Sequence, residues 1–248
     1  MRGTSTSRWA LSSDARRRLR TVGVVVALAF PAASPVLGAQ GVVSGQIAVV
    51  ERQGADRTDL RSAVIYLEPR GRNVQASGGR PTPREAVIAM TGREFVPHVR
   101  VILAGGTVSF PNQDPFSHNV FSNAEAGPFD LGLYRRSASR SANFPRTGIY
   151  PIYCNIHSRM VSFVIAVPSP LVAVVAADGR FTIPDVPEGT YLLHAWHERA
   201  GARVTREVAV SAAGLSGQRI VLDTRAYVAG PHLNKFGLPY AATREDRY

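Results

Sequence analysis

The chain contains a single cysteine, and a histidine and a methionine follow it at intervals of three residues. Cys154, His157 and Met160 place a thiol, an imidazole and a thioether within seven residues. Sulfur and imidazole donors favour soft metal ions, and a mononuclear copper centre for electron transfer needs two histidines and one cysteine, with a weak axial methionine. This segment supplies three of the four ligands, so a second histidine must come from elsewhere in the sequence.

His118 is the best candidate for that second histidine. It lies between the turn-rich residues 111–115, P-N-Q-D-P, and the apolar pair Val120 and Phe121. Proline, asparagine and aspartate favour turns, whereas valine and phenylalanine favour strands. We therefore expect His118 at the start of a strand.

Each of these residues has an ordinary explanation when it is taken alone. A lone cysteine is most often a small buried hydrophobe, a lone histidine is usually a satisfied polar group, and a methionine often fills a core. A cysteine nucleophile activated by a histidine is a further alternative, and it would make the protein an enzyme. This alternative leaves Met160 and the strand-rich surroundings without a role, so the combination of residues favours a metal site.

The same motifs resemble those of the cupredoxins, the type 1 blue copper fold. The resemblance is carried by H-N-V after an N-x-D turn and by G-x-Y-x-x-Y-C-x-x-H-x-x-M at residues 148–160. The C-x-x-H-x-x-M spacing is similar to the short ligand loop of amicyanins and shorter than the loop of plastocyanins. The resemblance implies one copper ion, alternating between Cu(I) and Cu(II), with the ligands His118, Cys154, His157 and Met160.

The resemblance also implies what surrounds the ligands and what the site does. Asn119 would tie the two ligand-bearing loops together through hydrogen bonds, and we expect Asn112 and Asn155 to support the ligands from outside. The implied function is that of a one-electron carrier, not an enzyme, with a redox partner such as a cytochrome or a dehydrogenase. The imidazole of His157 would be the exit for electrons. A copper-binding or storage module and a structural surface protein are the alternatives.

The first 39 residues differ in composition from the rest. Four arginines at positions 16–18 and 20 precede the short apolar run 21–30, and small residues follow up to Ala39. A positive region, a short apolar region and a small-residue cleavage site are typical of a secretory signal peptide. The run is far shorter than the ~20 apolar residues of a spanning helix. We therefore expect a periplasmic or secreted mature chain without a stable membrane span.

Charge and cysteine content argue against other functions. Without residues 1–39, which hold six arginines and one aspartate, the 29 basic and 18 acidic side chains become 23 and 17. The positive charges are scattered and form no basic stripe interleaved with aromatic residues, so we do not expect nucleic-acid binding. Exported proteins that use disulfides carry even sets of cysteines, so a single thiol needs another role, such as binding a metal.

Strand-like segments predict an all-β fold, with a cupredoxin Greek-key β-sandwich plus a second, smaller β-sandwich. Residues 84–168 are assigned to the cupredoxin domain. Strands are expected at 86–90, 99–103, 107–110, 142–153 and 161–167, and a loop with turns is expected at 125–141. Gly105 and Gly106 are expected to form a tight turn between two of these strands.

The residues on either side of this domain resemble a carboxypeptidase regulatory-like domain, which is a small transthyretin-like sandwich. Residues 169–223 contain a D-G turn at Asp178 and Gly179 followed by strand-like runs. The opening strands that such a domain needs resemble residues 41–72, so we hypothesise a discontinuous sandwich into which the copper domain is inserted. The alternative is two consecutive domains in which residues 41–70 belong to the cupredoxin. Residues 224–248 are expected to be a tail, either laid over the surface or disordered.

The other histidines are not expected to bind metal. His194 and His197 are three residues apart, and on a strand this spacing directs the side chains to opposite faces. His98 and His232 have no cysteine or second histidine nearby in the sequence. A metal site needs several donors that converge, so we interpret all four as structural or exposed residues.

Overall fold

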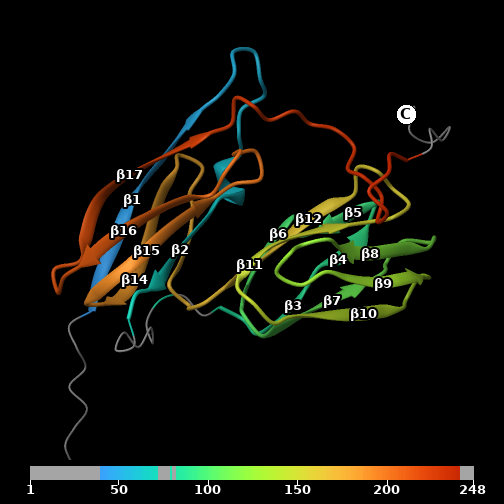
Figure 1. The fold of residues 1–248 in the computed structure, drawn as a ribbon, viewed down its shortest axis with the longest axis horizontal. Helices are drawn as coiled ribbons and strands as arrows, with labels where there is room; N and C mark the ends of the chain where they lie inside the picture. The colour runs from blue at the N-terminus through green and yellow to red at the C-terminus, as the bar shows by residue number, and fades with distance from the viewer. Residues whose placement is uncertain (1–39, 72–78, 80–81, 241–248) are drawn as a thin grey trace, which may run out of the picture. The chain divides into compact units, whose positions relative to one another are not determined.

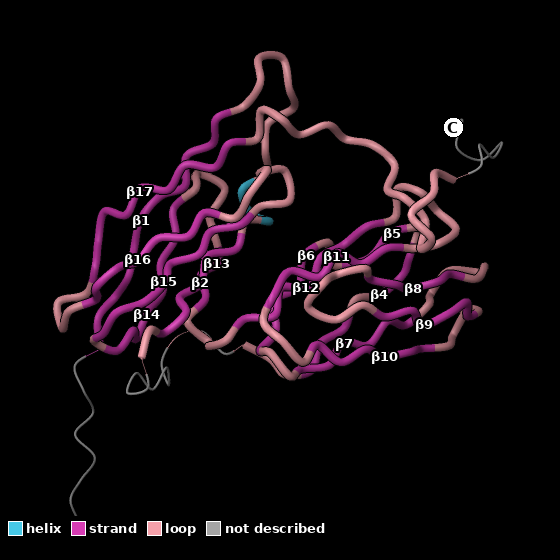
Figure 2. Tube along the Cα trace, in the orientation of Figure 1, coloured by secondary structure: helices cyan, strands magenta, loops and turns pink. Residues whose placement is uncertain are grey.

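The computed structural model describes residues 40–71, 79 and 82–240 (Figure 1). These residues form strands joined by loops and turns, with one short 3-10 turn at Leu60–Ser62 (Figure 2). This confirms the all-β class. In the part of the chain that the structure describes, no helix is long and apolar enough to cross a membrane. Residues 1–39, interpreted as a signal peptide, lie outside the described residues.

The cysteine loop belongs to a first sandwich, built from β3 to β12. One sheet has the strand order β6-β12-β11-β8-β9, and a facing sheet has the order β10-β7-β3. The strands of the larger sheet are β6 (Val99–Leu103), β8 (His118–Ser122), β9 (Phe129–Tyr134), β11 (Gly148–Tyr153) and β12 (Val161–Val167). The facing sheet contains β3 (Glu85–Val87), β7 (Gly106–Pro111) and β10 (Ser139–Phe144). The short strands β4 (Ala89–Thr91) and β5 (Glu94–Val96) pair separately.

The core of the first sandwich comes from residues that alternate along its strands. In β7, buried and partly exposed residues alternate over all six positions, as expected where one face of a strand meets the core. The ring of Phe144 packs edge to face on Tyr150, with 4.9 Å between centroids. The hydroxyl of Tyr150 donates to the carbonyl of Arg146 at 2.8 Å, which satisfies the polar end of a buried side chain. Cys154 and Met160 belong to the same buried cluster, so the cysteine loop contributes to the core.

Three elements of this sandwich differ from the expectation. The strand expected at 86–90 is divided into β3 and β4 by Ile88, which is fully buried. The strand expected at 142–153 is also divided, into β10 and β11, because Pro145 follows β10 and has no N–H for the ladder. The segment 125–141, expected as a loop, contains β9 and the start of β10. Only one of the six residues of β9, an edge strand, is buried, so the apolar alternation that reveals strands is missing there.

Two further sheets form a second sandwich, which has fewer strands. Their orders are β14-β1-β17 and β13-β2-β15-β16. The strands are β1 (Gln40–Val50), β2 (Val64–Pro69), β13 (Val172–Val174), β14 (Arg180–Pro187), β15 (Gly189–Trp196), β16 (Val204–Val210) and β17 (Leu215–Asp223). The turn before β14 requires glycine, because Gly179 has a φ of +84° and a Cβ there would lie 2.4 Å from the carbonyl oxygen of Ile47.

Strands from before and after the first sandwich pair within the second. β1 pairs antiparallel with β14 and parallel with β17, and β2 pairs antiparallel with β13 and β15. The core between these sheets combines Ile47 and Leu67 with Leu193 and Leu222. This pairing is the one that the discontinuous arrangement requires. The domain boundaries at 41–72, 84–168 and 169–223 and the resemblance of this sandwich to a regulatory-like domain remain predictions.

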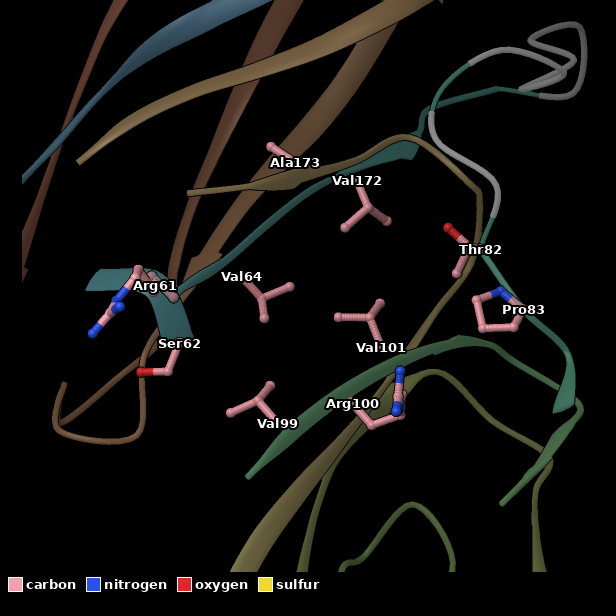
Figure 3. Close-up of a pocket in the computed structure, with 11 residues that line it drawn as sticks. Arg61, Ser62, Val64, Thr82, Pro83, Val99, Arg100, Val101, Val172 and Ala173 are labelled. Atoms are coloured by element: carbon pink, nitrogen blue, oxygen red, sulfur yellow. The ribbon is translucent and has the colours of Figure 1, made fainter. Parts of the chain in front are cut away.

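A third apolar cluster joins β2 and β15 to β12, and it includes Tyr66, Trp196 and Ile165. Beside it lies a cavity of about 330 Å³, lined by residues 61–63 and by residues of β2, β6 and β13, together with Thr82 and Pro83 (Figure 3). No sulfur or imidazole group lines this cavity. The cavity is therefore separate from the residues that could hold a metal.

Candidate metal centre

Strand pairing brings the candidate ligands to one end of the larger sheet. β8 begins at His118, β11 ends at Tyr153, and the two strands are antiparallel neighbours. The start of one antiparallel strand lies beside the end of its neighbour. His118 therefore lies close to Cys154, which directly follows β11, and His157 lies in the loop between β11 and β12.

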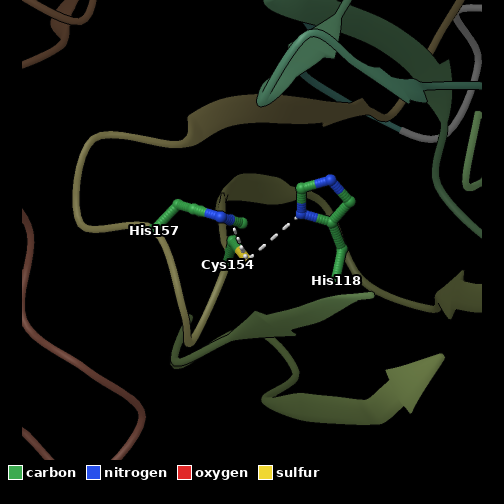
Figure 4. Close-up of side chains that lie close together, drawn as sticks. All are labelled: His118, Cys154 and His157. Carbon is green, nitrogen blue, oxygen red and sulfur yellow. Dashed lines mark hydrogen bonds between the residues drawn. The ribbon is translucent and has the colours of Figure 1, made fainter. Parts of the chain in front are cut away.

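Cys154, His118 and His157 form a compact cluster (Figure 4). The Sγ atom of Cys154 lies 3.7 Å from Nδ1 of His118 and 3.6 Å from Nδ1 of His157. One ligand atom from each residue lies within 4.8 Å of the other two. Cys154 and His118 are fully buried, whereas His157 is partly exposed. The structure thus brings together three of the four ligands predicted from the sequence.

The donor atoms fit one ion that binds both sulfur and nitrogen. Separations of 3.6 and 3.7 Å are longer than ordinary hydrogen bonds. They leave room for an ion bonded to both atoms, because metal–sulfur and metal–nitrogen bonds in zinc proteins are about 2.3 and 2.0 Å long. A thiolate with two imidazoles is the trigonal donor set of blue-copper sites. The residues present therefore fit copper.

Met160, the fourth predicted ligand, is 2 % exposed and directly precedes β12. Its amide donates to the carbonyl of His157 at 3.1 Å, and its carbonyl accepts the amide of Cys154 at 3.2 Å. These two backbone hydrogen bonds close the loop 154–160. Coordination by the thioether of Met160 remains a prediction.

The thiol of Cys154 lies in a buried position that also contains hydrogen-bond donors. Burial raises its pKa, and the backbone amides of Asn119, Ile156 and His157 act in the opposite direction. Amide donors directed at a sulfur atom favour its thiolate form. A metal ion binds that form, so metal binding displaces the thiol proton.

A buried carboxylate that sequence reasoning missed orients His118. Oδ2 of Asp114 lies 2.8 Å from Nε2 of His118, and both side chains are buried. An imidazole that donates a hydrogen bond from Nε2–H to a carboxylate keeps Nδ1 as an acceptor, and here Nδ1 faces Cys154. Asp114 also accepts the backbone amides of Gly92 at 2.6 Å and Arg93 at 2.9 Å. The turn between β4 and β5 therefore fixes the carboxylate that fixes the ligand.

The pKa of Asp114 reflects these contacts. Burial acts to raise the pKa, but hydrogen bonds from the backbone of Arg93, the side chain of His118 and the backbone of Gly92 outweigh it, and the pKa is lowered. The carboxyl group is therefore ionised at neutral pH. The N-x-D motif contained this residue, but the motif indicated only a turn.

Asn112 shapes the turn that leads to His118. Its Nδ2 donates to the carbonyl of Phe116 at 2.8 Å and to the carbonyl of Tyr134 at 3.2 Å. Its Oδ1 accepts the amide of Asp114 at 2.9 Å. Asn112 thus supports the carboxylate that orients the ligand.

The other two asparagines differ from the expectation. The side chain of Asn119 donates to Asp130 on β9 at 2.7 Å and does not join the two ligand-bearing loops; its backbone amide is the group that acts on Cys154. The side chain of Asn155 accepts the amide of Lys235 at 2.9 Å, so it binds the C-terminal segment.

Phe116 packs against both imidazoles. Its ring centroid lies 5.2 Å from that of His118 and 5.7 Å from that of His157. The guanidinium of Arg93 lies over the same ring at 5.3 Å. Ile156, next to His157, is 45 % exposed. The His157 side of the cluster is therefore the one that faces solvent.

The remaining histidines bind other partners. Within the described ranges, none of them belongs to a group of three side chains that could hold a metal ion. Their hydrogen-bond partners are Glu198 for His98 (2.8 Å), Glu68 for His194 (2.9 Å), Ser62 for His197 (2.9 Å) and the carbonyl of Leu233 for His232 (2.8 Å).

The described part of the expected tail lies over the ligand loop. The amide of His232 donates to the carbonyl of Ser158 at 2.9 Å, and the hydroxyl of Tyr240 donates to the carbonyl of Cys154 at 2.7 Å. The sequence of this segment shows no periodicity, so it contained no signal for these contacts. Residues 241–248 lie outside the described part.

Comparison with solved structures finds cupredoxins. A novel purple cupredoxin from Nitrosopumilus maritimus aligns with 24 % identity over 33 % of this chain and 99 % of its own chain, with a TM-score of 0.30. Amicyanin from Paracoccus versutus (Thiobacillus versutus) aligns with 19 % identity over 38 % of this chain and 97 % of its own, with a TM-score of 0.32. No protein-family model and no curated protein matches the chain.

Proposed function

We propose that the protein is a cupredoxin-type one-electron carrier that holds a single copper ion with His118, Cys154, His157 and Met160. The observation that supports this most directly is the convergence of one buried thiol and two imidazole Nδ1 atoms within 4.8 Å. When bound, copper would supply one-electron exchange between Cu(II) and Cu(I).

The residues of the chain keep the ligands in fixed positions. His118 and Cys154 are held by the pairing of β8 and β11, and Asp114 fixes the orientation of the His118 ring. Ligands that are held by their surroundings need little rearrangement when the charge of the site changes. Such a site is suited to rapid electron exchange.

The exposure of the ligands supports electron transfer over catalysis. Cys154 and His118 are fully buried, so a substrate has no access to the thiol or to that imidazole. His157 is partly exposed beside the apolar side chain of Ile156. We propose that electrons leave through His157 and that a redox protein, such as a cytochrome or a dehydrogenase, docks there. We also propose that the protein is exported and works in the periplasm or outside the cell.

The test is the visible spectrum and the reduction potential of the copper-loaded protein. Cu(II) added to the reduced, metal-free protein should give an intense thiolate-to-copper band at one ion per chain, and the band should vanish and return on reduction and reoxidation. Cys154→Ser is the matched variant, because a hydroxyl group cannot replace the thiolate, and it should lack the band. Tight binding without reversible colour would favour a storage role, and a wild-type protein that takes up no copper would refute the proposal.

A further inference from the structure

The chain returns to the ligand loop after the second sandwich ends. β17 ends at Asp223, and hydrogen bonds join residues 231–240 to the loop 154–160. In Figure 1 the red end of the described chain lies beside the yellow loop between β11 and β12. Three residues of this segment make the contacts, two through backbone amides and one through a side-chain hydroxyl.

His232 contacts the chain on both sides of the pair Cys154 and His157. Its amide donates to the carbonyl of Ser158 at 2.9 Å, just after His157. Its ring stacks on Tyr153, just before Cys154, with 4.5 Å between centroids and 30° between planes. A single residue thus contacts the chain before Cys154 with its ring and after His157 with its backbone amide.

Tyr240 binds the cysteine itself. Its hydroxyl donates to the backbone carbonyl of Cys154 at 2.7 Å. Its ring meets the ring of His232 edge on, at 5.4 Å and 90°. The two anchors therefore support each other as well as the loop.

Lys235, the only lysine in the chain, connects the segment to both ligand-bearing elements. Its amide donates to Oδ1 of Asn155 at 2.9 Å, and its ammonium group lies 2.6 Å from Asp130. Asp130 also accepts the side chain of Asn119, which follows His118 in β8. The segment is therefore linked to the start of β8 as well as to the loop.

We propose that residues 231–240 form an integral part of the metal centre, with His232 and Tyr240 as positioning residues that hold the loop 154–160 in its ligating shape. Two backbone hydrogen bonds close this loop from within. Contacts from outside the loop remove further conformational freedom, and ligands that are held in place before binding are bound more tightly. The effect on the bound ion rests on the proposed function, whereas the effect on the loop does not.

The first test needs no metal. Tyr240→Phe removes only the hydroxyl that donates to Cys154, and His232→Ala removes the stacked ring. Tyr227→Phe is the matched control, because it removes a hydroxyl from the same C-terminal region, where the ring lies by Arg199 at 5.3 Å. Hydrogen exchange of the amides of 155–160 in the copper-free full chain should be about three- to tenfold faster in Tyr240→Phe, as expected for the loss of one hydrogen bond, and faster still in His232→Ala. In the two test variants, peptides from β6 should exchange at the wild-type rate. In the control variant Tyr227→Phe, the loop 155–160 should also exchange at the wild-type rate.

The second test uses the copper-loaded protein. Tyr240→Phe should shift the thiolate-to-copper band and the copper hyperfine splitting in electron paramagnetic resonance, which a loss of general stability alone would not move. Loop exchange and spectra equal to those of Tyr227→Phe in both variants would overturn the inference. A wild-type protein that forms no visible band would refute the copper assignment, and the exchange experiment would still decide whether the segment holds the loop.

Discussion

Asp114→Asn perturbs the carboxylate that holds His118 without changing the size of the side chain. In the wild type, Oδ1 accepts the amide of Gly92, and Oδ2 accepts both the amide of Arg93 and Nε2–H of His118. An asparagine has one oxygen and one NH₂ group, and the NH₂ group can only donate. Whichever way the asparagine amide is turned, its NH₂ group faces either the amide of Gly92 or the two donors from Arg93 and His118.

The cost follows from the burial of this group. The side chain of Asp114 is 8 % exposed and that of His118 is 0 % exposed, so a donor without an acceptor there costs about 1–3 kcal/mol. For a protein of this size, about 2 kcal/mol lowers the melting temperature by about 4–8 °C. Loss of the carboxylate also removes negative charge beside a ligand, which disfavours Cu(II), and the reduction potential should rise by about 60 mV for each tenfold loss of Cu(II) over Cu(I) affinity.

The assay is thermal unfolding of the metal-free protein followed by voltammetry of the copper-loaded protein. Asp178→Asn is the control, because Asp178 accepts an amide at 3.0 Å but its side chain is 48 % exposed. We expect this control to change the stability by no more than about 0.5 kcal/mol. If Asp114→Asn matched the control in both melting temperature and potential, the carboxylate would not be what orients His118.

Two further predictions concern the axial position and a charged pair. Met160→Leu is nearly volume-conserving in a buried position, so the protein should keep its fold and bind copper with a raised potential, and an unchanged potential would place Met160 outside the coordination sphere. The hydrogen bond to Glu198 raises the pKa of His98, with support from the charges of Glu198 and Glu94 and against burial. For Glu198, burial acts to raise the pKa, but the contacts with His98 outweigh it and the pKa is lowered. The contribution of His98 to the free energy of unfolding is therefore full below about pH 6.5 and is lost as the pH rises through the raised pKa. The contribution of Glu198 is instead lost as the pH falls through its lowered pKa. His98→Gln should cost at most about 1 kcal/mol in urea unfolding near pH 5.5, since the side chain is 41 % exposed, and less at pH 8.5; equal costs at both pH values would contradict this.

The sequence indicated those ligands that are recognisable from residue type and from neighbours within a few positions. Cys154 and His157 are three residues apart, and His118 could be placed because a turn and a strand start flank it. Asp114 could not be recognised as a partner of His118, because its role depends on backbone amides from a different hairpin. The direction of the Asn119 side chain likewise depends on β9, a strand that was not expected.

The fold was predictable where a strand alternates between buried and exposed residues or is rich in apolar residues. The limits of β6 and β12 agree with the expectation, because both are short segments rich in valine and isoleucine. β9 was missed because an edge strand with a single buried residue carries no apolar period. The contacts of residues 231–240 depend on tertiary structure alone, because the segment forms no strand that a local pattern could reveal.

The order of the strands explains why residues after the second sandwich contact the ligand loop. The chain enters the first sandwich at Pro83 and leaves it after Val167, and the carbonyls of these two residues accept the amides of Leu103 and Ala104, at 3.0 and 2.9 Å. The ligand loop lies at the other end of β12, and the seven residues of that strand separate the two ends by about 20 Å. Pro83 and Val167 therefore lie far from the ligands, and a substitution at Pro83 should leave the metal centre intact. The segment after β17 reaches the opposite end, so substitutions there should change the metal centre although they are remote from it in the sequence.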